Sequence, residues 1–488
     1  MQLQDKTLLR QQGWIGGTWC DAATGAHYAV HNPANGQWLA DVANMDERDT
    51  QRAIDVAASA LTAWRALTGK ARGRYLRDWF ALIERHADDL ARIMTAEQGK
   101  PLAEARGEIS YAASFVEWYA EEARRICGDV IDSPMPGKRM MVLKQPVGVC
   151  AAITPWNFPA AMITRKVAPA LAAGCTVIVK PAEQTPLTAL ALAELAQRAG
   201  LPSGVLNIVT GSADHAPRIG QTLTAHPVVR KLSFTGSTEV GRLLMAQCAP
   251  TLKRISLELG GHAPFIVFDD ADLDAAVTGA MQCKFRNAGQ TCISANRFLV
   301  QSGVYEAFTA RLASAMDKLK VGNGMDEGVT VGPLIDRVAV EKVSAQVTDA
   351  LSGGARLLRG GKNKQHHALG GQFFEPTLLA DVAPSMRCMR EETFGPLAPV
   401  MRFESEDEAI RLANDTEYGL AAYFYSRDMA RVWRVAEALD YGMVGINSTT
   451  LSNEAGPFGG IKQSGMGREG SKYGIEEYLE LKYLNLGL

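Results

Sequence analysis

The chain has 488 residues, which is enough for two or three domains with sizeable cores. Hydrophobic residues make up 47% of the sequence and charged residues 21%, a balance typical of soluble globular proteins. Lys plus Arg number 51 and Asp plus Glu 53, so the net charge is −2, and no long block of one sign occurs. These values exclude a disordered chain and a small disulfide scaffold, and the charge does not favour nucleic acid or a membrane as a partner.

Targeting segments and metal-binding patterns are not evident in the sequence. The longest uncharged stretch, residues 145–164, contains three prolines and therefore does not predict a membrane-spanning helix. The first residues lack the apolar run of a signal peptide, and we expect a cytoplasmic protein. The eight cysteines and eight histidines form no CxxC pair and no HExxH pattern, so we predict neither a disulfide framework nor a metal site.

The first quarter of the chain is predicted to be mostly helical. Residues 13–43 are rich in turn signals and favour β-hairpins. Asp46 suits the N-cap of a helix to about residue 67, and a longer helical pattern covers residues 70–98 and stops at Gly99. Pro101 then begins a helix that we expect to run to about residue 126.

Residues 147–247 alternate short β-branched runs with Ala- and Leu-rich helical stretches, which predicts a parallel sheet with helices on its faces. Ligands of such sheets bind beyond the carboxyl ends of the strands. Three segments lie at these ends, residues 154–159, 180–186 and 234–241, and we expect them to converge on one crevice. A second α/β rhythm follows from residue 257 to about 447, and the closing residues 470–488 end in a segment with strand character.

Two of these segments could bind a nucleotide. Residues 234–241, FTGSTEVG, place Gly236 directly after a strand and before a helix, where free N–H groups suit a phosphate. The spacing fits neither GxGxxG nor a Walker A loop, so a purely structural turn is equally consistent with it. Lys180 and Glu183 follow the VIVK strand and could hold the two hydroxyls of a ribose, although a solvated pair at a strand end is the simpler interpretation.

Cys292 and Glu258 are candidates for covalent chemistry. Cys292 lies in a loop of small residues, NAGQTCIS, but a buried, inert cysteine is the commoner fate of a single thiol. As a nucleophile it would need help, because little thiolate exists at pH 7 with an unperturbed pKa near 8.5. Glu258, at the end of the ISLEL strand, could act as a general base or could be an ordinary strand-end carboxylate. No GxSxG pattern suggests a serine hydrolase.

Seven short motifs together indicate a family. In chain order they are TPWNFP, KPAEQTP, FTGSTEVG, ELGGHAP, NAGQTCISANR, EETFGP and PFGGIKQSGMGRE. In this order and approximate spacing the chain resembles the aldehyde dehydrogenase superfamily over essentially its full length. The segments KFRNAGQTC, LSNEAGPFGG and REGSKYGIEEYLELKY are most similar to those of succinate-semialdehyde dehydrogenases.

The resemblance implies an α/β fold of the aldehyde dehydrogenase type. A variant Rossmann domain for the dinucleotide would comprise residues 1–126 and 148–257, and a catalytic α/β domain residues 258–469. Residues 127–147 and 470–488 would form a small β oligomerisation domain, with homodimers or homotetramers usual. The cofactor would be NAD or NADP, bound without the GxGxxG fingerprint.

The resemblance also implies roles for individual residues. Cys292 would attack the aldehyde, Asn157 and the Cys292 N–H would hold the oxyanion, and Glu258 would activate the water that hydrolyses the thioester. The implied cofactor-binding residues are Thr154, Trp156, Lys180, Glu183, Gly236, Ser237, Glu392 and Phe394. We expect NAD to be preferred, because the Glu183 carboxylate would face the 2′-phosphate of NADP with like charge.

The implied substrate is an acidic semialdehyde. Arg165, Arg286 and Ser452 match the positions that bind the distal carboxylate in succinate-semialdehyde dehydrogenases, and an arginine offers a fork that suits a carboxylate. Succinate semialdehyde is the favoured substrate and glutarate semialdehyde the alternative. A coenzyme-A-acylating enzyme would not need Glu258, and a non-catalytic protein on the same fold would not need Cys292 and Asn157 as well.

Overall fold

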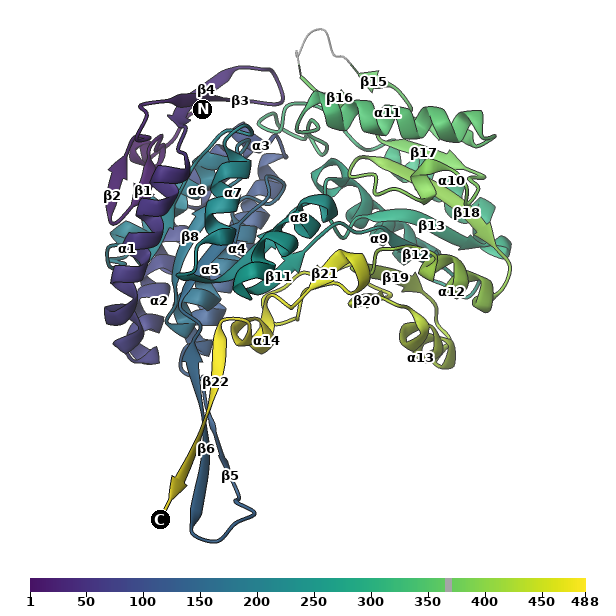
Figure 1. The fold of residues 1–488 in the computed structure, drawn as a ribbon. Coiled ribbons are helices and arrows are strands. Elements are labelled where there is room, and N and C mark those ends of the chain that lie inside the picture. The colour runs from purple at the N-terminus through teal and green to yellow at the C-terminus, as the bar shows by residue number, and fades with distance from the viewer. Residues whose placement is uncertain (365–370) are drawn as a thin grey trace.

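Two large β-sheets lie side by side in a computed structural model of the protein, and a third, small sheet projects from beneath the first (Figure 1). The structure describes residues 1–364 and 371–488. Within the described residues, the first sheet has eight strands, in the order β2-β1-β9-β8-β7-β10-β11-β21. Their bounds in that order are Thr18–Cys20, Gly13–Ile15, Leu206–Ile208, Thr176–Lys180, Val149–Ile153, Val229–Thr235, Arg254–Glu258 and Gly465–Met466.

The five central strands of this sheet, from β9 to β11, run parallel to one another. Parallel strands need crossover helices, and here these are α5 (Ala161–Ala173), α6 (Pro186–Arg198), α7 (Ala216–Ala225) and α8 (Thr238–Cys248). The helices are Ala- and Leu-rich on the faces they bury, and the sheet is apolar on both sides. The predicted βα alternation is therefore confirmed, and the carboxyl ends of β7, β8 and β10 lie at one edge.

Four N-terminal helices cover the first sheet: the first packs on the strands beside α7, and the other three pack on or next to α5 and α6 on the opposite face. They are α1 (Glu47–Ala66), α2 (Gly69–Arg85), α3 (Ala87–Gln98) and α4 (Leu102–Glu122). Asp46 caps α1 as expected. The single helix predicted for residues 70–98 is wrong, because the chain breaks at His86, where φ is −103° and ψ 17°. The break lets α3, which is almost wholly buried, pack in a different direction from the amphipathic α2.

In the part of the chain that is described, the second sheet has seven strands, in the order β14-β17-β18-β13-β12-β19-β20. Their bounds in that order are Arg356–Arg359, Thr377–Ala380, Leu397–Phe403, Ala295–Gln301, Ala263–Val267, Ala421–Tyr425 and Met443–Ile446. The accompanying helices are α9 (Leu273–Phe285), α10 (Tyr305–Met316), α11 (Arg337–Ser352), α12 (Glu406–Asn414) and α13 (Met429–Ala438). Two clusters of buried apolar side chains, one on each face, hold this sheet between its helices.

The third sheet contains β5 (Asp129–Ile131), β6 (Lys138–Pro146) and β22 (Leu479–Gly487), with β6 in the middle. β22 pairs antiparallel with β6 from Leu479 opposite Pro146 to Gly487 opposite Lys138. Apolar side chains such as Val130 and Leu481 are exposed on it, at 81% and 68%. The chain therefore brings the two segments predicted to pair, far apart in sequence, into one projecting sheet (Figure 1).

Smaller elements complete the described chain. The hairpin of β3 (His27–His31) and β4 (Trp38–Ala43) lies above the first sheet in Figure 1, β15 (Asn363–Lys364) pairs with β16 (Phe373–Phe374), and α14 (Ser471–Glu476) precedes β22. β21 pairs antiparallel with β11 at the edge of the first sheet. After the second sheet, the chain therefore returns to the first one at residues 465–466. Among the described helices, none has the length and hydropathy needed to cross a membrane.

Candidate active site

The loop that carries Cys292 lies between two cavities. The first, which we call the aromatic cavity, has a volume of about 440 Å³ and is lined by Trp156, Phe158 and Phe394 together with Cys292 itself. The second, which we call the arginine cavity, has a volume of about 350 Å³. It is lined by Gln282, Cys283, Arg286, Thr291, Ile293, Tyr423, Thr449, Thr450, Leu451 and Ser452. The two neighbours of Cys292, at positions 291 and 293, thus face the second cavity while the thiol faces the first.

The aromatic cavity forms where the carboxyl ends of the first sheet meet the second α/β unit. Residues 155–158 follow β7, residues 235–237 follow β10, and residues 258–260 follow β11, and all three segments line it. Residues 392–394 and the start of α11 close it from the other side. The expected convergence therefore holds for the first and third of the predicted segments, 154–159 and 234–241.

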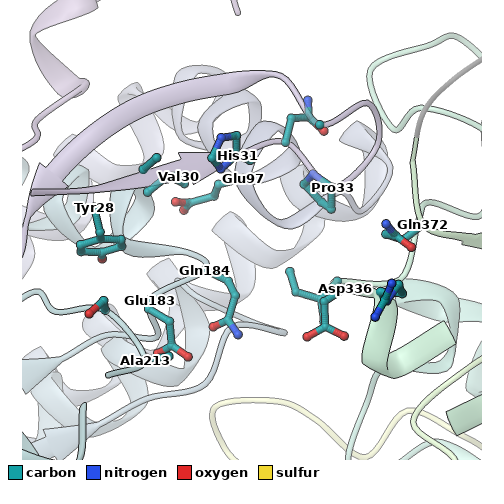
Figure 2. Close-up of a pocket in the computed structure, with 16 residues that line it drawn as sticks. Tyr28, Val30, His31, Pro33, Glu97, Glu183, Gln184, Ala213, Asp336 and Gln372 are labelled. Atoms are coloured by element: carbon teal, nitrogen blue, oxygen red, sulfur yellow. The ribbon is translucent and has the colours of Figure 1, made fainter. Parts of the chain in front are cut away.

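The segment 180–186 lies at a neighbouring cavity instead. Glu183 and Gln184 line a space of about 400 Å³, shown in Figure 2, which we call the acidic cavity. In this view Glu183, Gln184 and Asp336 lie along its lower part, with Tyr28 and Glu97 across from them. Ile335 and Asp336 line both this cavity and the aromatic one, so the two adjoin.

The Cys292 loop is held in an unusual backbone conformation. Asn287, Ala288 and Gly289 have consecutive positive φ values of 50°, 54° and 75°. The loop is fixed by hydrogen bonds, because the Asn287 N–H donates to Glu104 Oε2 at 2.8 Å and its side-chain amide donates to the Asn157 carbonyl at 3.0 Å. A Cβ on Gly261 would lie 2.3 Å from the Cys292 carbonyl oxygen, so only glycine allows this close approach.

The Cys292 thiol is protonated at neutral pH in this resting structure. Burial raises its pKa to about 12, the charge of Arg165 acts to lower it, and the charges of Glu392 and Glu258 raise it. A thiol in this state is a poor nucleophile, because the thiolate is the reactive form. Attack on an aldehyde therefore requires a base that removes the proton.

Glu258 is a buried carboxyl group whose surroundings favour its protonated form. The residue is 2% exposed, and neither carboxyl oxygen has a hydrogen-bond partner among the described residues. Burial, and next the negative charge of Glu469, raises the pKa of Glu258 well above its usual range, while Arg165 and Lys166 oppose the shift. A carboxyl with a raised pKa binds a proton more tightly than an ordinary carboxyl does, which suits a general base.

The Asn157 side chain lies against the same loop. Its Nδ2 donates to the Gln290 carbonyl at 3.1 Å, and Lys100 Nζ donates to the Asn157 carbonyl at 2.8 Å. This places an amide donor on the wall of the aromatic cavity that also contains Cys292. Preorganised N–H donors of this kind stabilise an oxyanion that forms on a bound carbonyl.

The predicted cofactor-binding residues divide between the cavities. Trp156 and Phe394 form an edge-to-face pair with centroids 5.6 Å apart in the aromatic cavity. Gly236 lines it too, and a Cβ there would lie 2.4 Å from the Phe234 ring. Ser237 caps α8 by accepting the Val240 N–H at 3.3 Å. The backbone at the N-terminus of α8 is thus left uncovered by a side chain at Gly236, which suits a dinucleotide phosphate. The two aromatic rings in the same cavity suit a ring of the dinucleotide.

The remaining predicted cofactor residues lie either at the aromatic cavity or at the end of β8, beside the acidic cavity. Glu392 accepts the Gly261 N–H at 2.9 Å, and burial raises its pKa. Lys180 and Glu183 form an ion pair with Nζ and Oε2 3.0 Å apart at the end of β8. Thr154 lies behind them, 4% exposed, with its N–H donating to the Lys180 carbonyl.

The three predicted substrate-binding residues are not all together. Arg286 and Ser452 line the arginine cavity, and the Arg286 guanidinium lies 5.0 Å from the centre of the Phe158 ring. Arg165 is 1% exposed, and its guanidinium is paired with Glu469 Oε2 at 2.6 and 2.9 Å. One further nitrogen of Arg165 donates to the Tyr111 hydroxyl at 3.3 Å.

Sequence analysis did not identify the buried charge network behind Glu258. Glu469 pairs with both Arg165 and Lys166, and these two cations hold its pKa low, at about 2, against the effect of burial. Lys166 also donates to Thr235 at 2.6 Å. Glu469 ends the PFGGIKQSGMGRE motif, so the motif was the available signal. Lys342, on α11, also lines the aromatic cavity and carried no comparable signal.

Comparison with known proteins identifies the family. A model described as the aldehyde dehydrogenase family matches residues 19–484. The chain belongs to this family. It is 62% identical to glutarate-semialdehyde dehydrogenase of Pseudomonas aeruginosa and 62% identical to succinate-semialdehyde dehydrogenase [NADP(+)] GabD of Escherichia coli, with 100% of each chain covered. Its structure matches a crystal structure of succinate-semialdehyde dehydrogenase from Burkholderia pseudomallei with a TM-score of 0.98, at 60% identity and complete coverage of both chains.

These findings confirm the predicted family, the α/β fold and the assignment as an oxidoreductase that uses NAD(P). They do not confirm a preference for NAD, since the Escherichia coli relative is named for NADP. The roles of the individual site residues and the domain boundaries stay predictions.

Proposed function

We propose that this aldehyde dehydrogenase oxidises succinate semialdehyde to succinate. The observation that carries the proposal is the arginine cavity, in which Arg286 has no ion pair with any described residue and lies with Ser452 and three threonines. A guanidinium with nearby hydroxyl donors is suited to a carboxylate at the far end of a short aldehyde. The names of the similar enzymes from Escherichia coli and Burkholderia pseudomallei support the same substrate.

In the proposed reaction the Glu258 carboxylate takes the proton of the Cys292 thiol, and the sulfur attacks the aldehyde carbon. The carbonyl oxygen becomes an oxyanion that the Asn157 amide and the Cys292 N–H stabilise. Bound NAD(P)⁺ supplies the hydride acceptor that allows this thiohemiacetal to become a thioester. Glu258 then releases the thiol proton to solvent and becomes a carboxylate again. It takes a proton from the water that attacks the thioester, the C–S bond breaks to release the acid, and the Cys292 thiolate takes that proton back from Glu258.

The residues of the aromatic cavity fit a dinucleotide. Gly236 leaves room for a close approach to the start of α8, and Trp156 and Phe394 provide apolar surface beside Cys292. Glu392 would hold the nicotinamide ribose, and Lys180 with Glu183 the adenosine ribose. We propose that NAD is preferred over NADP, because a 2′-phosphate near Glu183 would meet the like charge of that carboxylate in a cavity that Asp336 also lines.

Glutarate semialdehyde is the second candidate substrate. The relative from Pseudomonas aeruginosa carries that name at the same 62% identity as the Escherichia coli enzyme. One methylene changes binding by only about 1 to 3 kcal/mol, so a cavity of about 350 Å³ can accept both acids. Arg165 stays a proposed third contact to the carboxylate, although its guanidinium already bonds Glu469.

We propose that the enzyme is cytoplasmic and assembles as a homodimer or homotetramer through the third sheet. The outer edge of β22 exposes unpaired backbone and apolar side chains such as Leu481 and Tyr483, at 68% and 53%. An exposed strand edge of this kind is a pairing surface. Sedimentation of the full chain tests this assembly, and a monomer at micromolar concentration would contradict it.

The activity is tested by following NAD(P)H absorbance with succinate semialdehyde, glutarate semialdehyde and butanal, each with NAD and with NADP. We expect the two acids to have a much higher kcat/KM than butanal, and no requirement for coenzyme A. Equal use of butanal would contradict the carboxylate site. A product that forms only with coenzyme A would contradict the hydrolytic role of Glu258.

A further inference from the structure

A strongly basic cavity lies far from Cys292, at the base of the third sheet. It has a volume of about 600 Å³ and lies among the end of α1, the start of α2, the ends of α4 and α5, and the last residues of β6. Its lining includes five cationic side chains and, within the described residues, no acidic one: Arg65, Lys70, Arg72, Arg124 and Lys144. We call this space the basic cavity. None of its lining residues lines the aromatic, arginine or acidic cavity.

Arg72 forms the buried part of this cavity. It is 8% exposed, and its Nε donates to the Ala172 carbonyl at 3.0 Å while Nη1 donates to the Leu67 carbonyl. Among the described residues, no carboxylate pairs with it, and burial lowers its pKa. A buried cation without an anion is unfavourable, because protein carbonyls replace only part of its hydration. Arg72 therefore provides a positive charge for which an anion from outside would compensate.

The other cations are only partly balanced. Lys144 pairs with Glu476 at 2.5 Å, but the described chain offers no ion pair to Arg65, Lys70 or Arg124. The C-terminal ends of α1, α4 and α5 meet here and each carries roughly half a negative charge. These ends and Glu476 together leave about two and a half of the five positive charges uncompensated. The helix C-termini and Glu476 thus compensate only part of the positive charge in the basic cavity.

The start of α2 adds backbone donors to the cavity. Gly69 and Lys70 are the first two residues of α2, and their N–H groups have no hydrogen-bond partner among the described residues. A Cβ on Gly69 would lie 2.1 Å from the Ala123 carbonyl oxygen, so glycine is what allows α2 to begin directly against the end of α4. This contact brings Arg124 next to the free N–H groups of α2.

We propose that the basic cavity binds a small soluble anion that carries a diphosphate group. Arginine forks and free helix N–H groups are the donors that recognise phosphate oxygens. Two linked phosphates match both the excess of positive charge and the room available, whereas a single phosphate would leave part of each unused. Because Lys144 belongs to β6 and the other cations to the helices, the ligand would tie the third sheet to the helical layer.

The experiment measures binding of inorganic diphosphate to the full-length enzyme by calorimetry, at physiological ionic strength and with saturating NAD⁺ to occupy the cofactor site. We expect one additional site per chain, with orthophosphate bound roughly tenfold more weakly. The test variant is Lys70→Gln/Arg124→Gln, whose two side chains are exposed and can be replaced without loss of the fold. It should weaken diphosphate binding about tenfold or more.

The matched control is Arg74→Gln/Arg85→Gln, which removes two exposed charges from the same helix outside the cavity. Its diphosphate affinity should stay within about twofold of the wild type. Both variants should keep wild-type kcat and KM for the aldehyde, and diphosphate should raise the Tm of the wild type and the control but not of the test variant. Absence of the additional site, equal weakening in both variants, or equal affinity for orthophosphate would each overturn the proposal.

Discussion

The two cavities on either side of the Cys292 loop differ in how they present charge. The aromatic cavity is walled by rings and backbone, and its two carboxyls, the buried Glu258 and the half-buried Glu392, have raised pKa values. The arginine cavity has an exposed cation, Arg286, among hydroxyl groups. Chemistry that moves protons requires groups whose protonation changes near neutral pH, whereas recognition of an acid requires a charge that does not change. Under the proposed function, the aromatic cavity would carry out catalysis and the arginine cavity would select the substrate.

The largest expected effect is that of Cys292→Ala. Removing the sulfur should lower kcat/KM by roughly 10⁴-fold or more, because no covalent intermediate can form. Dinucleotide affinity, measured by fluorescence titration, should change little because the rest of the aromatic cavity remains. Substantial turnover by the variant would show that Cys292 is not the nucleophile, and Cys127→Ala, which removes an exposed thiol that lines none of the four cavities, serves as the matched control.

Glu258→Gln should slow turnover about 10²- to 10⁴-fold through loss of the base that activates water. A rapid burst of NAD(P)H followed by slow turnover is expected in stopped-flow absorbance. The raised pKa means that the carboxylate form increases as pH rises and is lost as pH falls through that pKa. Wild-type deacylation should therefore accelerate as the pH rises through the raised pKa of Glu258. An equal pH dependence in the variant would contradict the role of Glu258.

Arg165→Gln tests the buried charge network behind Glu258, in which Glu469 pairs with Arg165 and Lys166. Glu469 would keep only Lys166 as a cationic partner, and breaking a buried pair costs about 3 to 5 kcal/mol. We expect the free energy of unfolding in urea to fall by about that amount, with butanal and succinate semialdehyde affected alike. If stability is unchanged and only KM for the acid rises, Arg165 binds the substrate directly.

Arg286→Gln should instead leave stability near that of the wild type. Loss of a charge-assisted hydrogen bond to the substrate carboxylate should cost about 2 kcal/mol, or roughly thirtyfold in kcat/KM for succinate semialdehyde. Butanal, which has no carboxylate, is the internal control and should be used as before. A parallel loss with both aldehydes would mean that Arg286 does not select the substrate.

The smallest expected effect concerns the cofactor. Glu183→Ser should improve the NADP/NAD ratio of kcat/KM by about 1 kcal/mol, roughly fivefold, because the side chain is partly exposed and its charge is screened. Glu239→Ser, in the first turn of α8 and outside the acidic cavity, is a control for general charge effects. A wild-type preference for NADP would refute the proposal that Glu183 favours NAD.

Features that depend only on residues close together in the sequence could be predicted from local patterns. The cap at Asp46, the stop at Gly99 and the alternation around β7, β8 and β10 follow from short-range chemistry, and the ordered motifs indicated the family. Local patterns did not predict the break at His86 between α2 and α3, because its cause is the burial of α3 against α4 and α6.

The sequence alone determined the family, the α/β class, the candidate nucleophile Cys292 and the candidate base Glu258, because these follow from residue type, order and spacing. Only the tertiary structure decided which charges meet. It pairs Arg165 with Glu469, 304 residues away, and leaves Arg286 in a cavity with Ser452. It also gathers Arg65, Arg72 and Arg124 around one space. Whether an ionisable group is buried, paired or free depends on distant segments that only folding brings together, and this sets its protonation and its function.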